Sequence, residues 1–156
     1  MLKVSLPLCA CLLVLGCRNR HLRARIHAVQ DTVPFYESSE QGSFAVTTVV
    51  HNEDQQTLFV ALCGMGAQRE IDGAWTTVFT PVCASNGLTP LAPKDSIVVP
   101  VSIIAYRNNI FPQLDPRMKP GRYRILFGVF NGDPEGQPRA TIGQAEPSNA
   151  FIAQQR

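Results

Sequence analysis

The sequence has few charged residues and few of the side chains that carry catalysis. Charged residues make up 17% of its 156 positions, against roughly 25% in an ordinary soluble chain. Neither the Gly-x-Ser-x-Gly motif of serine hydrolases nor the Gly-x-x-x-x-Gly-Lys-Ser/Thr motif of phosphate-binding loops occurs. Cys-x-x-Cys, which a thiol redox site would need, is absent as well. We therefore expect a protein that is not an enzyme and that uses no cofactor.

The first apolar stretch is too short to cross a membrane. Residues 4–16 carry no charge and follow a single lysine, Lys3, whereas a spanning helix needs about 20 apolar residues. This pattern predicts the hydrophobic region of a signal peptide. The region ends in LVLGC at residues 13–17, which resembles the lipobox of bacterial lipoproteins.

The lipobox resemblance implies that residues 1–16 are a lipoprotein signal peptide and that Cys17 is acylated, which makes membrane lipid a partner. LCAC at residues 8–11 is a poorer match, because it would leave a very short hydrophobic region. An ordinary cleaved signal and an uncleaved anchor are the alternatives. The resemblance places the protein in the bacterial cell envelope. Arg18 stands where an aspartate would resemble an inner-membrane retention signal, which favours the outer membrane in a cell with two membranes.

Basic residues are concentrated just after Cys17. Four arginines and no acidic residue lie between positions 18 and 27, and each would contribute about 1 kcal/mol near an anionic lipid surface. We expect residues 17–30 to form a basic tether without a core face. Residues 28–156 contain 9 basic and 12 acidic residues, a net charge of −3, so nucleic acid is not an expected partner.

After the tether, short segments alternate between apolar and polar residues, which predicts an all-β protein. The segments expected to form strands are residues 29–36, 43–52, 57–63, 74–82, 96–104, 122–130 and 149–153. Pro100 cannot donate a ladder hydrogen bond, so its strand should lie at a sheet edge or carry a bulge. About seven short strands in residues 31–156 predict an immunoglobulin-like β-sandwich.

Tyr123 follows a Pro-Gly turn at the start of the penultimate predicted strand. This placement resembles the tyrosine corner of immunoglobulin-like folds, in which the hydroxyl binds backbone upstream. A strand tyrosine with a hydrated hydroxyl is the alternative.

Residues 36–153 as a whole resemble a bacterial immunoglobulin-like domain family of secreted and lipid-anchored proteins. The resemblance is carried by Cys63-Gly64, Trp75, Cys83, Pro93, Ser96, the segment PGRYR at residues 120–124 and the segment SNAF at residues 148–151. It implies the fold and an envelope location. It implies no chemistry, because the family is largely of unassigned function.

Cys63 and Cys83 lie in the predicted domain and are expected to form a disulfide, which an envelope location permits. If the chain turns at Asp72-Gly73, a three-residue turn or one bulge puts the two cysteines directly opposite. Cross-strand Cα separations of about 4.5–5.5 Å suit a disulfide. Two buried thiols and a metal site are the alternatives. Trp75 is expected to cover core near this pair, with a ligand platform as the alternative.

Two acidic loops are expected at one end of the sandwich. Glu53 and Asp54 follow the first long predicted strand, and Asp133 and Glu135 lie in the last hairpin loop. These loops share an end in immunoglobulin-like folds, so their carboxylates could converge on a calcium ion or a basic partner. The alternative is that they are hydrated turn residues, and no resident metal is expected. His51, the one histidine in the predicted domain, should be a hydrated strand-end residue.

The segment of residues 106–119 is expected to cross between the sheets and to expose Ile110 and Phe111, which either contact a partner or pack beneath the loop. The sequence therefore predicts a membrane-anchored envelope lipoprotein whose non-enzymatic immunoglobulin-like module binds an unknown envelope protein or surface ligand, in adhesion or envelope assembly. The alternative is an immunoglobulin-like protease inhibitor of the cell envelope, with residues 106–119 as its blocking loop.

Overall fold

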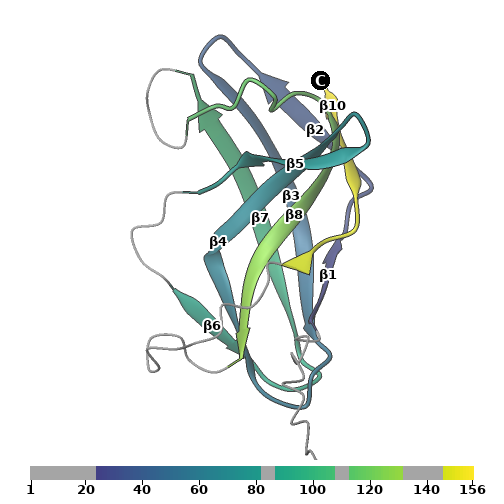
Figure 1. Ribbon diagram of the computed structural model, residues 1–156, viewed down its shortest axis with the longest axis vertical. Helices are drawn as coiled ribbons and strands as arrows, with labels where there is room; N and C mark the ends of the chain where they lie inside the picture. The colour runs from purple at the N-terminus through teal and green to yellow at the C-terminus, as the bar shows by residue number, and fades with distance from the viewer. Residues whose placement is uncertain (1–23, 82–86, 108–112, 132–145) are drawn as a thin grey trace, which may run out of the picture.

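The structure is a computed structural model that describes residues 24–81, 87–107, 113–131 and 146–156. These residues form ten strands and no helix (Figure 1), and so none of them belongs to a helix that is long and apolar enough to span a membrane. In chain order the strands are β1 (Ala24–Ala28), β2 (Thr32–Glu37), β3 (Gln41–Asn52), β4 (Leu58–Ile71), β5 (Ala74–Phe79), β6 (Leu88–Leu91), β7 (Ser96–Tyr106), β8 (Gly121–Asn131), β9 (Glu146–Pro147) and β10 (Phe151–Gln155).

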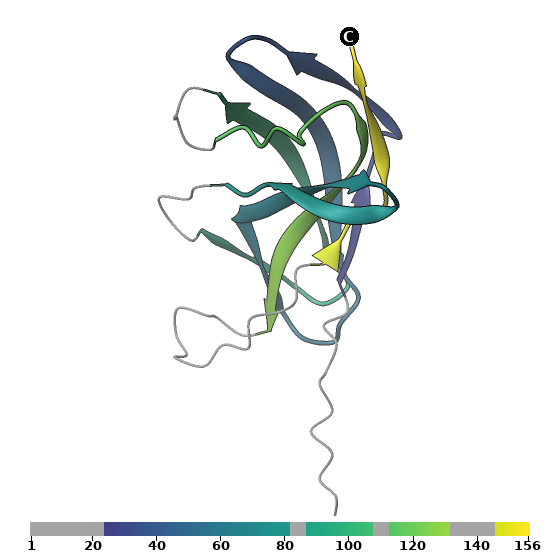
Figure 2. The same cartoon turned by 45° about the horizontal axis from the view of Figure 1, so that its top comes forward.

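The strands form one continuously hydrogen-bonded sheet that folds over into two layers (Figures 1 and 2). In the first layer β1 and β7 lie on either side of β3 and run antiparallel to it. In the second layer β8 lies between β10 and β4, and β5 and β6 pair with β4. β2 joins the layers, because it pairs antiparallel with β3 and parallel with β10. The chain changes layer three times, between β3 and β4, between β6 and β7 and between β7 and β8. This is an immunoglobulin-like β-sandwich, as predicted.

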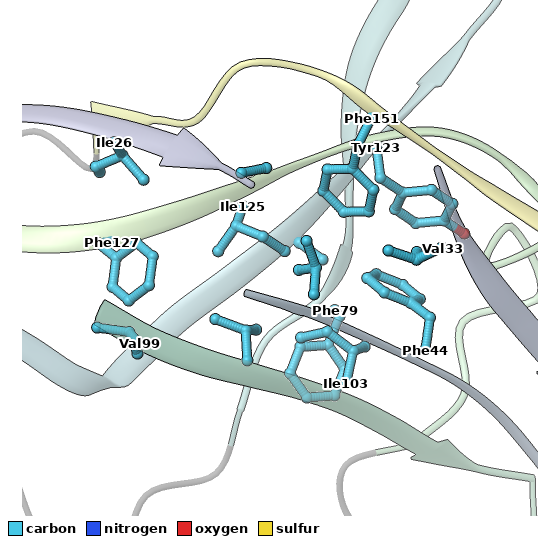
Figure 3. Packing of buried hydrophobic residues seen from close by; sticks show 14 of the residues in the cluster. Ile26, Val33, Phe44, Phe79, Val99, Ile103, Tyr123, Ile125, Phe127 and Phe151 are labelled. Atoms are coloured by element: carbon cyan, nitrogen blue, oxygen red, sulfur yellow. The ribbon is translucent and has the colours of Figure 1, made fainter. Parts of the chain in front are cut away.

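The core lies between the two layers and follows from the alternation of the sequence. Every second residue of β8, from Tyr123 to Val129, is fully buried, and β3 buries Phe44 and every second residue after it on the opposing layer. The ring of Phe44 lies 4.8 Å from that of Tyr123 and 5.8 Å from that of Phe151, centroid to centroid (Figure 3). Burial of each such side chain contributes about 1.5–3 kcal/mol, so these rings account for a large part of the packing between layers.

A tight turn at Asp72 and Gly73 joins β4 to β5. Both residues have positive φ, 51° and 78°, as a two-residue type I′ hairpin requires. One register shift follows between Ala67 and Gln68. Beyond that shift Ala67 pairs with Phe79. Along an antiparallel pair without a bulge the residue numbers of partners have a constant sum, and this sum is the same for 67 and 79 as for 63 and 83. The predicted bulge is therefore present, and the register runs toward pairing Cys63 with residue 83.

β7 is an edge strand in the described part of the chain, since β3 is the only strand with which it pairs and the bridge from Gln113 reaches only its last residue, Tyr106. Backbone bonds from Arg107 to Glu40 and from Asn52 to Asp95 continue the ladder at each end of β7. They show that its odd-numbered residues bond to β3. The even-numbered Pro100 therefore faces the free edge, where its missing N–H breaks no bond, as the sequence predicted.

The expectation of a featureless tether up to residue 30 is wrong for its last part. Ala24–Ala28 form β1 and pair with β3, and Ile26 and Ala28 are buried while Arg25 and His27 are exposed. The domain therefore begins no later than Ala24. Period-two alternation is present in this segment, but the neighbouring arginines made it read as polar. The short strands β6 and β9 were not predicted either.

Candidate functional site

The two ends of the sandwich carry different groups of residues. We call the end at which β1 begins the tether end and the opposite end the far end. Ala24 pairs with Asn52 and Leu58 with Asn131, so the tether end holds the start of β1, the β3–β4 connection and the end of β8. The far end holds the β2–β3 and β4–β5 turns, the end of β7, the start of β8 and the C-terminus (Figure 1).

The predicted acidic loop of Glu53 and Asp54 lies at the tether end. Glu53 forms an ion pair with Arg25 at 2.8 Å, and the Lys94 ammonium donates to the Glu53 carbonyl at 2.6 Å. The Asp54 carboxylate accepts from the backbone N–H of Gln55. Asp133 and Glu135 lie outside the described residues. Among the residues that are described, no three His, Cys, Asp or Glu side chains are grouped so that they could hold a metal.

A buried asparagine organises the same end. Asn52 is fully buried, and its amide donates to the carbonyls of Gln56, Leu91 and Ala92 while its oxygen accepts from Asp54 N–H. These bonds tie the β3–β4 connection to the end of β6.

His51 Nδ1 lies 2.7 Å from the Ser96 hydroxyl on β7, at an exposed position. A histidine beside a serine is one part of a nucleophilic site, but a serine hydrolase also needs a group that orients the histidine. Within the described ranges no ion pair links His51 to a carboxylate. The contact is a cross-strand pair at the end of the ladder.

Tyr123 occupies the far end of the core. Its side chain is fully buried, and its hydroxyl donates to the Lys119 carbonyl, four residues upstream, at 2.6 Å. That bond defines a tyrosine corner. Burial raises the pKa of the phenol, so the hydroxyl stays protonated and remains a donor.

Arg69 holds the segment that leads into β8. Arg69 on β4 lies opposite Tyr123 on β8 in the strand register. Its guanidinium donates to the backbone carbonyls of Arg117 and Pro120 at 3.2 and 3.1 Å. Gly121 permits this approach, because a Cβ there would lie 2.8 Å from Arg69 Nε and because its φ is +154°. Arg69 Nε is buried and has no hydrogen-bond acceptor in the described part of the molecule. No sequence pattern predicts this role, since an arginine in a strand is ordinarily expected to face outward.

An ionic cluster fixes the other side of the same segment. Glu37 at the end of β2 accepts from Lys119 at 2.6 Å and from Arg107 at 2.5 Å. The hydrogen bond from Lys119, aided by the charge of Arg107, lowers the pKa of the Glu37 carboxyl. The hydrogen bond from Arg117 likewise lowers the pKa of Asp115.

The crossing segment is thus attached to the far end on both sides. Gln113 bridges to Tyr106, Leu114 N–H donates to the Tyr106 carbonyl, and Met118 is buried. The predicted contact residues Ile110 and Phe111 lie outside the described residues, between these two attachment points.

Trp75 does not cover the core, contrary to expectation. It is half-buried on β5 opposite Glu70, and it is not among the hydrophobic residues that pack against the core. Its ring instead lies beside the guanidinium groups of Arg124 and Arg122, whose Cζ atoms are 4.5 and 5.7 Å from the ring centroid. Cys63 is half-buried in β4. Cys83 lies outside the described residues, so the disulfide stays a prediction.

The SNAF segment has a structural role that its sequence did not disclose. The Asn149 side chain accepts from the Ala28 N–H at 2.6 Å and donates to the Ala28 carbonyl at 3.3 Å, as a strand residue would. The Ser148 hydroxyl accepts from the Ile125 N–H. These two residues close the ladder where β1, β8 and the C-terminal segment meet.

Comparison with known proteins adds no family. No protein-family model matches the sequence, and no curated protein matches it. Among solved structures, a target of the Northeast Structural Genomics Consortium is 13% identical with a TM-score of 0.42, over 87% of this chain and 88% of that one. A β-glucosidase from Listeria innocua is 10% identical with a TM-score of 0.37, over 86% of this chain and 16% of that one. The PapD-like domain 7 of human CEP192 is 15% identical with a TM-score of 0.32, over 100% and 96%. Similarity at this level supports no argument about function.

Proposed function

We propose that the protein is a bacterial envelope lipoprotein, anchored through acylated Cys17, whose immunoglobulin-like sandwich is a non-enzymatic binding module. The observation that carries the proposal is the position of β1. Ala24 begins the first strand at the tether end, seven residues after Cys17. Seven residues reach at most about 25 Å, so an acylated Cys17 would hold the tether end close to the lipid.

This geometry divides the surface between membrane and partner. The loops with Glu53 and Lys94 would face the bilayer, and the far end would face away from it. The far end holds the crossing segment through Arg69, Glu37 and the tyrosine corner. A surface held in place before binding loses less conformational freedom when a partner docks. The far end is therefore the better candidate for partner contact.

The anchor is tested on the native protein. Mass spectrometry of the mature N-terminal peptide should show an acylated Cys17 with residues 1–16 removed. A Cys17→Ser variant should move from the membrane fraction to the soluble fraction, while a Cys63→Ser variant should remain in the membrane. An unmodified residue 17 in the mature membrane-bound protein would reject the anchor.

A protease inhibitor is the second candidate, because both described flanks of residues 108–112 are fixed to the far end. Fixed flanks are what a loop that blocks an active-site cleft requires. The full-length protein in nonionic detergent should then inhibit at least one member of a protease panel at micromolar concentration. Inhibition by the wild type that is lost on Phe111→Ala would favour this candidate over the general binding module, and no inhibition would exclude it.

A further inference from the structure

The outer face of the second layer carries a linked set of polar and aromatic side chains. We call it the Trp–Arg face, formed by Gln68, Glu70, Trp75, Thr77, Arg122 and Arg124. The residues come from three neighbouring strands, β5, β4 and β8, and they are connected in register. They lie toward the far end, beside the β4–β5 turn.

Arg124 is held in one orientation at the centre of this face. Its Nε donates to the Gln68 side-chain oxygen at 2.8 Å, and Gln68 in turn donates to the Thr77 hydroxyl at 3.2 Å. The guanidinium lies 4.5 Å from the Trp75 ring centroid, an attractive contact between a cation and a ring face. These contacts fix the Nε edge, while in the described part of the chain no residue accepts a hydrogen bond from the two Nη groups.

The charge of Arg124 has no acidic partner on this face. Arg122 pairs with Glu70 at 2.7 Å, so the face keeps one uncompensated positive charge. In the described ranges no carboxylate lies within ion-pair distance of Arg124. A planar guanidinium with its terminal nitrogens open suits a carboxylate, which it can bind through two parallel hydrogen bonds.

The surroundings favour a protein ligand over a lipid headgroup. Arg122 is paired across the strands with Ile152, whose side chain is 41% exposed. Tryptophan, arginine and an exposed aliphatic side chain together are typical of the residues that dominate protein–protein binding. If the tether end faces the bilayer, this face is remote from the headgroups.

We propose that the Trp–Arg face docks an acidic peptide segment of a partner protein, with a carboxylate on the Arg124 guanidinium and apolar atoms against Trp75 and Ile152. The inference deepens the proposed function by naming the binding surface of the module and the chemistry of its partner.

Trp75 is the only tryptophan in the chain, so its fluorescence reports on this face directly. The full-length protein in nonionic detergent is titrated with an octaglutamate peptide, and with octaglutamine and octalysine as controls. Octaglutamate should change Trp75 emission saturably. Arg124→Gln should weaken its binding about tenfold or more, as a central contact would, and Arg124→Lys should weaken it too, because lysine lacks the planar fork.

Arg117→Gln is the matched control, since it removes one positive charge away from the face, and it should change affinity less than about twofold. Equal losses in Arg124→Gln and Arg117→Gln would reduce the effect to general electrostatics and overturn the proposal. An unchanged affinity in Arg124→Gln, or no binding by the wild type, would also overturn it. If Arg124→Gln does not fold by circular dichroism, Trp75→Leu, with binding followed by a fluorescent label on the peptide, takes its place.

A Cys17→Ser variant separates the two proposals. It should bind octaglutamate as tightly as the wild type does, whether or not Cys17 of the wild type is acylated. Vesicles containing phosphatidylglycerol provide the last arm. A change in Trp75 emission with vesicles but not with octaglutamate would assign the face to lipid and reject a peptide partner.

Discussion

Single residues at the far end decide how the segment before β8 is held. The Tyr123 hydroxyl and the Arg69 guanidinium together bind three carbonyls of residues 117–120. Each bond reaches backbone that no strand partner satisfies. The bonds to Lys119 and Pro120 are partly buried, and a backbone carbonyl left without a partner in a buried place costs about 1–3 kcal/mol, so we expect these two bonds to contribute most.

Tyr123→Phe should lower the free energy of unfolding by about 1–3 kcal/mol, because it removes the hydroxyl and leaves the Lys119 carbonyl without its donor. Urea denaturation followed by circular dichroism measures the change. Tyr36→Phe is the control, since Tyr36 is exposed and, among the described residues, its hydroxyl accepts from Arg156 alone. An equal loss in both variants would contradict a special role for Tyr123.

The Glu37 cluster makes stability depend on acid. The pKa of the Glu37 carboxyl is lowered in the folded protein. Its contribution to the free energy of unfolding is therefore complete above the usual glutamate pKa of about 4.3, and it is lost as the pH falls through the lowered pKa. Glu37→Gln should therefore unfold at a lower urea concentration than the wild type at pH 6. The two midpoints should converge near pH 2. A difference that is the same at both pH values would exclude this linkage.

The structural roles of some of these residues can be predicted from the sequence, and those of others cannot, for physical reasons. Tyr123 was found because a tyrosine after a Pro-Gly turn has one well-defined partner in this fold. Arg69 was missed, since its partners are backbone carbonyls far along the chain and leave no pattern. Trp75 was misplaced because its hydrophobicity suggested burial in the core, whereas its ring lies beside the guanidinium groups of Arg122 and Arg124.

At the scale of elements, β7 is the strand that most needs protection from pairing with other chains. Its eleven residues carry no charge, and Val98 and Ile104 are exposed at 63% and 39%. Charged residues and proline are the usual means by which an edge strand avoids pairing. On β7 Pro100 is the only residue of these kinds, and it faces the free edge, where it can oppose pairing with another chain.

Pro100→Thr should restore an N–H donor to that edge and cause concentration-dependent self-association. Sedimentation equilibrium of the full-length protein in detergent would detect the dimer. Adding Val98→Lys to this variant should reverse the association, because a lysine on the edge opposes pairing. A monomeric Pro100→Thr protein at all concentrations would show that the edge is protected by something else.

The β4–β5 hairpin carries the disulfide prediction. The type I′ turn and one bulge put Ala67 opposite Phe79, and the same register continued would put Cys63 opposite residue 83. Non-reducing peptide mapping should recover Cys63 linked to Cys83. Replacing both by serine should lower stability by roughly 3 kcal/mol in the chain-entropy model. Alkylation of both cysteines without prior reduction would contradict the bridge.

The alternation of β3, β7 and β8 was sufficient to predict these strands and their buried faces, whereas Pro100 led to the prediction that β7 lies at an edge or carries a bulge. Strand lengths were harder, because β4 runs from Leu58 to Ile71 through two register shifts, and an alternating pattern does not survive a bulge. β1 was missed because the neighbouring arginines made a segment with period-two alternation appear polar, and its pairing with β3 leaves no pattern of its own in the sequence.

At the scale of the whole molecule, the proposed anchor predicts which surface lies near lipid. The protein is reconstituted into vesicles that contain brominated phospholipids, which quench nearby tryptophan. Native Trp75, near the far end, should be little quenched. A tryptophan placed at Ala92 in a Trp75→Phe background should be strongly quenched, because Ala92 lies at the tether end beside Asn52. Equal quenching at the two positions would contradict the orientation.

The parallel pairing of β2 with β10 has a mechanical consequence. The chain enters the body at one end through β1 and leaves it at the other through β10 (Figure 1). A pull between Ala24 and Gln155 therefore runs along the strands, and it loads the hydrogen bonds of β1 with β3 and of β2 with β10 in shear. Bonds loaded side by side must rupture together, whereas an unzipping hairpin yields one bond at a time. Such a body would suit the proposed lipid anchor at Cys17, because tension applied at the far end would be carried through the strands to the lipid.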